Sequence, residues 1–295
     1  MRKRIIITNQ LGESIEICRE PYVLSSFDPS GNGADIVKTK GYMQDGISVG
    51  NVTLNEMTIP IEFFIKGSNL EEIYQLRQKM NSVINPKLGP FSFVVDMPHG
   101  TFTNTVSIES LPKYRVEDER YNIVQRGLFH ILLNDPYWKS EMVRSASLIE
   151  WEPLFSFPIE MGYMLGNQPV KNIIFGELRE VKTLYNDGHV ETPIRLKIYG
   201  DLKNPIVTNT TTGEKIAINI DIQNGQYIDV NTKRGERTVE IVEKNGTRKN
   251  IYNLLTLDSS LFQFQTGSNN LEYTAKIGIE TMQVEITYQK RYVGI

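Results

Sequence analysis

The chain is 295 residues long, and its 32 basic and 35 acidic side chains leave a formal net charge of -3. This length has room for about two domains, each with a core of its own. A nearly neutral chain presents no strong field to a polyanion, so we expect specific protein partners and no nucleic acid recognition. No apolar run approaches the ~20 residues that span a bilayer, and Ile5–Ile7 is too short for a signal peptide core, so membrane insertion is not expected.

The first strands are predicted from alternation of apolar and polar residues. Arg4–Asn9 and Ser14–Arg19 flank a turn and predict a hairpin, and Tyr22–Asp28 predicts a third strand. Cys18 lies in the second of these strands and is the only cysteine, so no intrachain disulfide can form. A buried structural thiol, in a protein that folds in a reducing compartment, is the expected role.

A long strand is predicted over Leu54–Lys66, where one face carries apolar side chains at every second position: Ile59, Ile61, Phe63 and Ile65. Pro60 lies on the other face. Because proline has no N–H to give to a sheet ladder, we expect this strand to lie at a sheet edge or to carry a bulge.

One helix follows. Ser68–Glu71 fits a capping box, Asn85–Pro86 ends the element, and apolar residues recur at helical spacing between them: Leu70, Ile73, Leu76, Met80 and Val83. Further strands are predicted at 91–96, 101–110 and 122–133. The sequence therefore predicts an α+β domain over residues 1–138, with one helix against a sheet, closed by Asp135–Trp138.

Residues 139–170 predict an irregular connection, because prolines and glycines are frequent there and periodicity is low. The segment also contains four aromatic residues: Trp151, Phe155, Phe157 and Tyr163. Exposing such large apolar side chains to water is unfavourable, so we expect the connection to lie against a neighbouring subunit or against the second domain of its own chain.

Residues 171–295 predict a β-sandwich. Alternation is clearest over Ile194–Ile198 and Ile216–Ile222, where every second residue is apolar. The turns between strands contain residues that favour tight connections, with Asn224–Gly225 the strongest hairpin signal. The whole chain is thus expected to be mainly β, with an α+β first domain and a sandwich as the second.

An ordered series of short motifs runs through the second half. It comprises Thr192–Pro193, Gly200, Asn204–Pro205, Asn209–Gly213, Gly225, Asp229, Lys233–Arg234, Asn245–Gly246, Ser259–Phe262, Thr266–Asn269 and Tyr273. The first half adds Ile59–Lys66, Leu76–Arg77, Pro86–Gly89, Phe91–Val95 and Asp135–Trp138. In this order the motifs resemble the distal tail proteins of long-tailed, non-contractile phages.

The resemblance implies a structural protein of the virion tail tip, made in the cytoplasm of a bacterial host. It implies that residues 1–138 form a split-barrel-like domain that assembles into a ring, usually a hexamer, and that residues 171–295 form a galectin-like sandwich. It also implies the partners of such a ring: other copies of the chain, the tail tube and tape measure proteins, and the tail-tip or baseplate proteins for host adsorption.

The search for chemistry yields no catalytic, cofactor-binding or metal site, and we expect no enzyme activity. His99, His130 and His189 have no partner at metal-ligand spacing, and no nucleophile elbow is present. The loop Asp28–Asp35 resembles the start of a calcium loop, but Thr39 stands where a glutamate is required, so a flexible, solvated loop is expected. The acidic pairs Glu71–Glu72 and Asp118–Glu119 are assigned to a helix start and a charged loop.

The alternative function is carbohydrate binding, since a galectin-like sandwich can hold sugar and phages bind cell walls. Sugar sites combine aromatic platforms with polar groups. The second domain offers only tyrosines, namely Tyr185, Tyr199, Tyr227, Tyr252 and Tyr273, with no tryptophan after Trp151. This composition favours the scaffold over the lectin.

Overall fold

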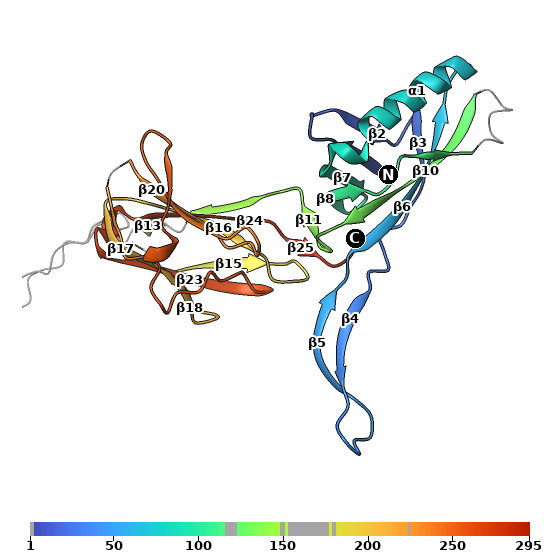
Figure 1. Cartoon of the computed structure of the whole chain (residues 1–295). Helices are drawn as coiled ribbons and strands as arrows, with labels where there is room; N and C mark the ends of the chain where they lie inside the picture. Colours follow the sequence, from blue (N-terminus) through green and yellow to red (C-terminus); the bar gives the residue numbers. More distant parts are fainter. Residues whose placement is uncertain (1–2, 116–122, 148–150, 153–176, 179–180, 224) are drawn as a thin grey trace, which may run out of the picture. The chain divides into compact units, whose positions relative to one another are not determined.

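A computed structural model describes residues 3–115, 123–147, 151–152, 177–178, 181–223 and 225–295. Contacts divide the chain into two units: unit 1 comprises Met1–Glu141 with Arg291–Ile295, and unit 2 comprises Met142–Lys290. The described residues are mostly in strands, with one α-helix in unit 1 (Figure 1). The predicted mainly-β class is confirmed.

The main sheet of unit 1 has the strand order β2-β1-β7-β8-β10-β6-β3, and every ladder in it is antiparallel. Its strands are β1 (Arg4–Thr8), β2 (Ser14–Ile17), β3 (Tyr22–Phe27), β6 (Met57–Lys66), β7 (Phe91–Met97), β8 (Gly100–Ile108) and β10 (Val124–Leu133). Short strands extend it: β9 (Lys113–Tyr114), β11 (Trp138–Ser140) and β25 (Arg291–Tyr292). A 3-10 turn, η1 (Pro86–Leu88), precedes β7.

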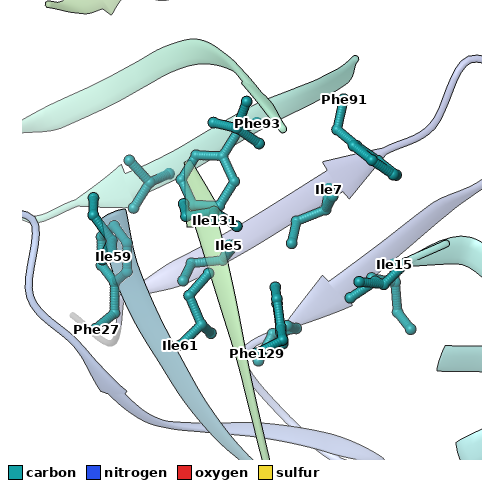
Figure 2. Packing of buried hydrophobic residues seen from close by; sticks show 14 of the residues in the cluster. Ile5, Ile7, Ile15, Phe27, Ile59, Ile61, Phe91, Phe93, Phe129 and Ile131 are labelled. Atoms are coloured by element: carbon teal, nitrogen blue, oxygen red, sulfur yellow. The ribbon is translucent and has the colours of Figure 1, made fainter. Parts of the chain in front are cut away.

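The core of unit 1 is formed by the inward-facing side chains of strands in which apolar and polar residues alternate. In β6 the residues from Met57 onward alternate between buried and outward positions, so one face is apolar throughout. Figure 2 shows isoleucines and phenylalanines from several strands packed together, with Ile5, Ile59, Ile61, Phe93 and Phe129 all fully buried. Aromatic rings add edge-on contacts, such as Phe63 against Phe129 at 5.8 Å between centroids.

Helix α1 (Leu70–Val83) begins one residue later than the predicted capping box. Asn69 is the N-cap, and its side chain accepts a hydrogen bond of 2.9 Å from the backbone N–H of Glu72. The Glu72 carboxylate accepts in turn from the backbone N–H of Ser68, at 2.6 Å. Asn69 is therefore the cap, because an asparagine oxygen caps as well as a serine one, and Glu72 satisfies the N–H of Ser68, one residue before the N-cap.

The long strand was expected to lie at a sheet edge or to carry a bulge, and β6 as a whole lies between β10 and β3, so it is not an edge strand. Pro60 stands opposite His130 of β10. On the other side the ladder with β3 ends at the pair Phe27–Ile61, and β3 has an irregularity between Leu24 and Ser26. At Pro60 only one neighbour strand remains, which is how an interior strand accommodates a proline.

The expected solvated loop Asp28–Asp35 ends in a strand, which begins at Ala34. Ala34–Thr39 (β4) pairs with Ser48–Leu54 (β5) as an antiparallel hairpin that joins no other strand among the described residues. In Figure 1 the pair stands out from the main sheet of unit 1. At its base the N–H of Asn55 donates to the carbonyl of Gly33 at 3.0 Å.

Unit 2 is a sandwich of two antiparallel sheets. One has the order β12-β24-β16-β20-β21-β22, and the other has the order β15-β23-β17-β18, with β19 paired to β17. The first comprises β12 (Arg144–Ser147), β16 (Ile194–Tyr199), β20 (Tyr227–Asn231), β21 (Thr238–Val242), β22 (Arg248–Asn250) and β24 (Gln283–Tyr288). The second comprises β15 (Val181–Asn186), β17 (Leu202–Asn209), β18 (Glu214–Ala217), β19 (Asp221–Ile222) and β23 (Gly267–Ile277).

The core of unit 2 lies between these sheets, where the predicted alternation places Ile194, Leu196 and Ile198 inward with Ile216 and Ile218. Smaller elements complete the unit: the two-stranded pair β13 (Trp151–Glu152) and β14 (Glu177–Leu178), and the 3-10 turns η3 (Tyr252–Leu254) and η4 (Ile279–Thr281).

The chain boundaries differ in two details from those expected. Arg144–Ser147, within the expected connection 139–170, pairs with β24 and so belongs to a sheet of unit 2. Residues 291–295 belong to unit 1, because Trp138 pairs with Tyr292 and Lys139 with Arg291. The aromatic residues Phe155, Phe157 and Tyr163 lie outside the described residues.

Candidate assembly surface

The three histidines lie on separate elements. His99 is in the turn before β8, where its ring packs on Phe102 at 5.3 Å between centroids. His130 lies in β10 of unit 1 and His189 in a loop of unit 2. Across the described ranges, no group of three or more His, Cys, Asp or Glu side chains is placed to hold a metal ion.

The acidic residues that the sequence singled out make local contacts. The Asp28 carboxylate accepts hydrogen bonds from the hydroxyl and the N–H of Ser30, at 2.6 and 3.0 Å, and these bonds lower the pKa of Asp28 below its ordinary value. Glu72 belongs to the cap of α1. Asp118 and Glu119 lie outside the described residues. None of the described helices is long and apolar enough to cross a membrane.

Two motifs of unit 2 meet in a buried pair of asparagines. Asn209 and Asn269 are both fully buried, and the amide of Asn209 donates to the side-chain oxygen of Asn269 at 3.1 Å. The other oxygen of the pair accepts from the N–H of Thr211, and the amide of Asn269 donates to the carbonyls of Gln265 and Gly267. The pair fixes the turn after β17 against the loop before β23, so these motif residues have a structural role.

A third motif residue, Asp229 of β20, forms ion pairs with arginines of two other strands, β16 and β22. Its side chain is 4% exposed and receives two hydrogen bonds from Arg195, at 2.8 and 2.6 Å, and one from Arg248 at 3.1 Å. Burial alone would raise the pKa of Asp229. The hydrogen bonds and charges of Arg195 and then Arg248 outweigh that effect, so the pKa of Asp229 lies below its ordinary value.

The lowered pKa predicts an acid-dependent contribution to stability. A carboxylate with a depressed pKa in the fold stabilises it above its unfolded pKa of about 4, and this contribution is lost as pH falls through the folded pKa. We expect Asp229→Asn to lower the free energy of unfolding by about 2 kcal/mol at pH 7, a modest value because both arginines are about half exposed and solvent screens their charges. The difference in free energy between this variant and the wild type should shrink below about pH 4.

Urea unfolding at several pH values measures this difference, with Asp221→Asn as the control. Asp221 makes a 3.2 Å pair with Lys203 but is 65% exposed, so its removal should change stability little at any pH. A deficit of Asp229→Asn that stayed constant down to pH 2 would contradict the electrostatic explanation.

The hairpin β4–β5 is almost wholly exposed within unit 1. Every residue of β4 is exposed, and so is every residue of β5 except Leu54. Large apolar side chains are nonetheless frequent on it, with exposed fractions between 43% and 96%: Ile36, Val37, Tyr42, Met43, Ile47, Val49 and Val52. Ile36 and Val52 are register partners and so share one face.

Two physical arguments indicate that this hairpin has a partner. An isolated two-stranded hairpin is marginally stable in water, because it buries little apolar surface. Each strand also has a free edge, since β4 and β5 pair only with one another in the described part of the chain. Free edges and a cluster of exposed apolar side chains are typical of surfaces that become covered on assembly.

Family models match both halves of the chain. Residues 10–124 match the phage tail protein RIFT-related domain. Residues 187–292 match the C-terminal domain of the siphovirus-type tail component. Among curated proteins, none matches the sequence.

Solved structures of phage proteins share the fold. The chain is similar to the SPP1 Dit protein, described as a paradigm of the hub adsorption apparatus in phages that infect Gram-positive bacteria. The TM-score is 0.65 at 10% identity, over 97% of this chain and 98% of that one. It is also similar to a chain of the phage P2 baseplate in its activated conformation with calcium, with a TM-score of 0.55, 12% identity and full coverage of both chains. The strontium form of that baseplate gives the same values.

The two family matches lie in separate units of the fold and together cover most of the sequence, which defines a structural protein of the phage tail. The chain belongs to the siphovirus distal tail protein family. The resemblance predicted from the motifs is confirmed. Sequence reasoning missed the hairpin, although its apolar residues could have been noted.

Proposed function

We propose that this protein forms a ring, usually a hexamer in the family, that joins the tail tube to the tail-tip or baseplate proteins used in host adsorption. The exposed hairpin of unit 1 carries the proposal. The proposed role of the protein is to position its partners, and no reaction is assigned to it. A ring of identical contacts gives each copy the same two neighbours and leaves two different faces for different partners.

The hairpin has the size that such a contact needs. It presents about twenty residues from Ala34 to Leu54, comparable to the 20–30 residues that each partner contributes to a stable interface. Its position on one side of unit 1 suits a heterologous contact, in which the hairpin of one copy packs on the next. Heterologous contacts close into rings when the rotation between copies is a whole fraction of a turn.

The partners follow from the two faces of the ring. We place the tail tube and tape measure proteins on one side and the tail-tip or baseplate proteins on the other, at the tip of the virion tail. Support comes from the relatives, which are an adsorption hub and a baseplate protein. Unit 1 is proposed as the ring-forming domain and unit 2 as the domain that projects from it.

The carbohydrate-binding alternative gains little from unit 2. Tyr273 is buried in the core, whereas Tyr199 and Tyr227 stack on one another at 5.0 Å between ring centroids. Tyr185 and Tyr252 are exposed but lie on β15 and η3. Tyr199 and Tyr227 thus form one stacked pair, and the other three tyrosines lie on other elements, so the five do not gather into one aromatic platform and the scaffold function is favoured.

Negative-stain imaging of the purified protein tests the proposed function. We expect closed rings of uniform diameter whose class averages have rotational symmetry. Fields of single compact particles at micromolar concentration, both alone and after addition of purified tail tube protein, would contradict the proposal.

A further inference from the structure

The chain passes between the two units twice. Glu141 ends unit 1 at the first crossing, and the segment Arg291–Ile295 returns to unit 1 after unit 2. At the first crossing β11 ends at Ser140 and β12 begins at Arg144. At the second, β24 ends at Tyr288 and β25 follows after two residues. Each crossing therefore joins a strand of one unit to a strand of the other through a very short link.

The strand that leads into the first crossing is fixed in unit 1. β11 pairs with β8, and Trp138 of β11 is fully buried and packs on Phe93 with 5.9 Å between ring centroids. Just before β11, the side-chain amide of the buried Asn104 donates to the carbonyls of Asp135 and Tyr137, at 3.0 and 3.2 Å. These contacts do not involve β25, so β11 stays in place whether or not β25 is paired beside it.

The returning strand is held by much less. In the part of the chain that the structure describes, β25 pairs with β11 alone, through the register pairs Trp138–Tyr292 and Lys139–Arg291. None of residues 291–295 is buried, and Val293 is 36% exposed. Local opening costs little free energy where few backbone hydrogen bonds and few buried apolar contacts are lost. This segment meets both conditions.

Two side chains hold the segment in unit 1. The guanidinium of Arg291 donates to the Asp135 carboxylate at 3.0 Å and lies over the ring of Tyr137, 4.1 Å from its centroid. The ring of Tyr292 meets Phe102 edge-on, with 5.4 Å between centroids. Both contacts are made by the first two residues of the segment, so substitutions there weaken its docking without altering the rest of unit 1.

Release of the segment leaves no buried charge without a partner. Breaking an ion pair is costly when the remaining charge stays buried and alone. The Asp135 carboxylate is also paired with the ammonium of Lys139 at 2.9 Å and accepts from the N–H of Tyr137 at 3.2 Å. It therefore keeps two partners when Arg291 leaves, and the Arg291 guanidinium gains water.

We infer that residues 291–295 form a releasable clasp. While the clasp is docked in unit 1, unit 2 has two attachments to that unit. When it detaches, unit 2 is tethered through Glu141–Val143 alone, where Met142 and Val143 are 74% and 55% exposed. A few residues between ordered elements can absorb the backbone rotations of a hinge. In the proposed ring, release lets unit 2 reorient while unit 1 keeps its place. The clasp itself does not depend on the ring, because all its contacts lie within one chain.

Hydrogen exchange of the intact protein tests whether the clasp opens. The slowest amide of residues 291–295 should exchange at least about a hundredfold faster than the slowest amide of Trp138–Ser140. Arg291→Gln and Tyr292→Ala should each speed exchange in the clasp by about tenfold more and leave Trp138–Ser140 unchanged. Arg234→Gln, which removes only an exposed ion pair of unit 2, is the matched control and should behave as the wild type. Equal rates in the wild-type clasp and in Trp138–Ser140 would show a permanent strand and overturn the inference.

Time-resolved fluorescence anisotropy measures the freedom of unit 2. Cys18 is buried, so a thiol dye should report on Leu257→Cys in unit 2 or on Leu11→Cys in unit 1, both at turns where the leucine is exposed. The two labels should decay with the same slow component in the wild type. Deletion of residues 291–295 removes the clasp outright, and the slow correlation time of the label in unit 2 should then fall by at least about twofold. The label in unit 1 should not change.

Two results of the deletion would overturn the clasp. An identical decay of the label in unit 2 with and without residues 291–295 would show that the first crossing alone restrains the unit. Loss of folded unit 1 on deletion, seen by circular dichroism, would show that the segment is an integral part of the fold. Both measurements can be read on a monomer, so a failure of the ring and a failure of the clasp are distinguishable.

Discussion

Removal of the hairpin is expected to convert the assembled protein to a folded monomer. The variant lacks residues 34–54 and joins Gly33 to Asn55 through a two-residue turn, which the backbone hydrogen bond between these two residues makes possible. The deleted strands bury nothing in the core of unit 1, so the melting temperature should stay within about 2 °C of the wild type. Their exposed apolar side chains are the contact that we assign to assembly, so the mass in solution should fall to that of one chain.

A matched control shortens the connection Glu243–Thr247 between β21 and β22 in unit 2. This turn is also a hairpin tip, but its side chains are polar. Its shortening should leave both assembly and melting temperature unchanged. A hairpin-deleted protein that keeps the assembled mass would show that another surface makes the ring.

Gly278→Ala is expected to destabilise unit 2 more than any other single methyl addition at a described turn. Gly278 has a φ of 85°, and a β-carbon built there overlaps the carbonyl oxygen of Asp201. The left-handed conformation costs about 1–2 kcal/mol for alanine, and the overlap with backbone adds to it, so we expect a loss of more than about 3 kcal/mol. Chemical denaturation followed by circular dichroism measures the loss, fitted by unit if two transitions appear.

Gly213→Ala separates the two causes. Gly213 also has a positive φ, of 75°, but an added β-carbon meets nothing within 4 Å. This variant should therefore lose only about 1–2 kcal/mol. Equal losses in the two variants would mean that the overlap at Asp201 relaxes without cost.

The strands that were predicted well from sequence each bury one face. In β6 and β16 the alternation of isoleucine with polar residues is a direct consequence of one face meeting a core. The helix was predicted for a similar reason, since α1 places Ile73, Met80 and Val83 inward. Motif residues such as Asn209 and Asp229 led to the family, and the structure explains them by buried hydrogen bonds and ion pairs.

The hairpin β4–β5, which sequence reasoning missed, buries no face within its own chain. In β4 and β5 both faces are exposed, so Ile36, Val37, Val49 and Val52 show no alternation that a core would impose. A surface that is buried only on assembly need not show the alternation of apolar and polar residues that a core imposes.

The return of Arg291–Ile295 to unit 1 could not be predicted for another reason. Its two-residue strand pairs with a segment about 150 residues earlier in the sequence.

The mass of the intact protein in solution tests the central claim most directly. Light scattering after gel filtration should give a fixed multiple of the 33.8 kDa chain, six copies if the ring follows the usual family number, that dissociates only on dilution. A mass of one chain at every concentration up to about 100 µM, with purified tail tube protein failing to raise it, would contradict the account of this protein as a ring.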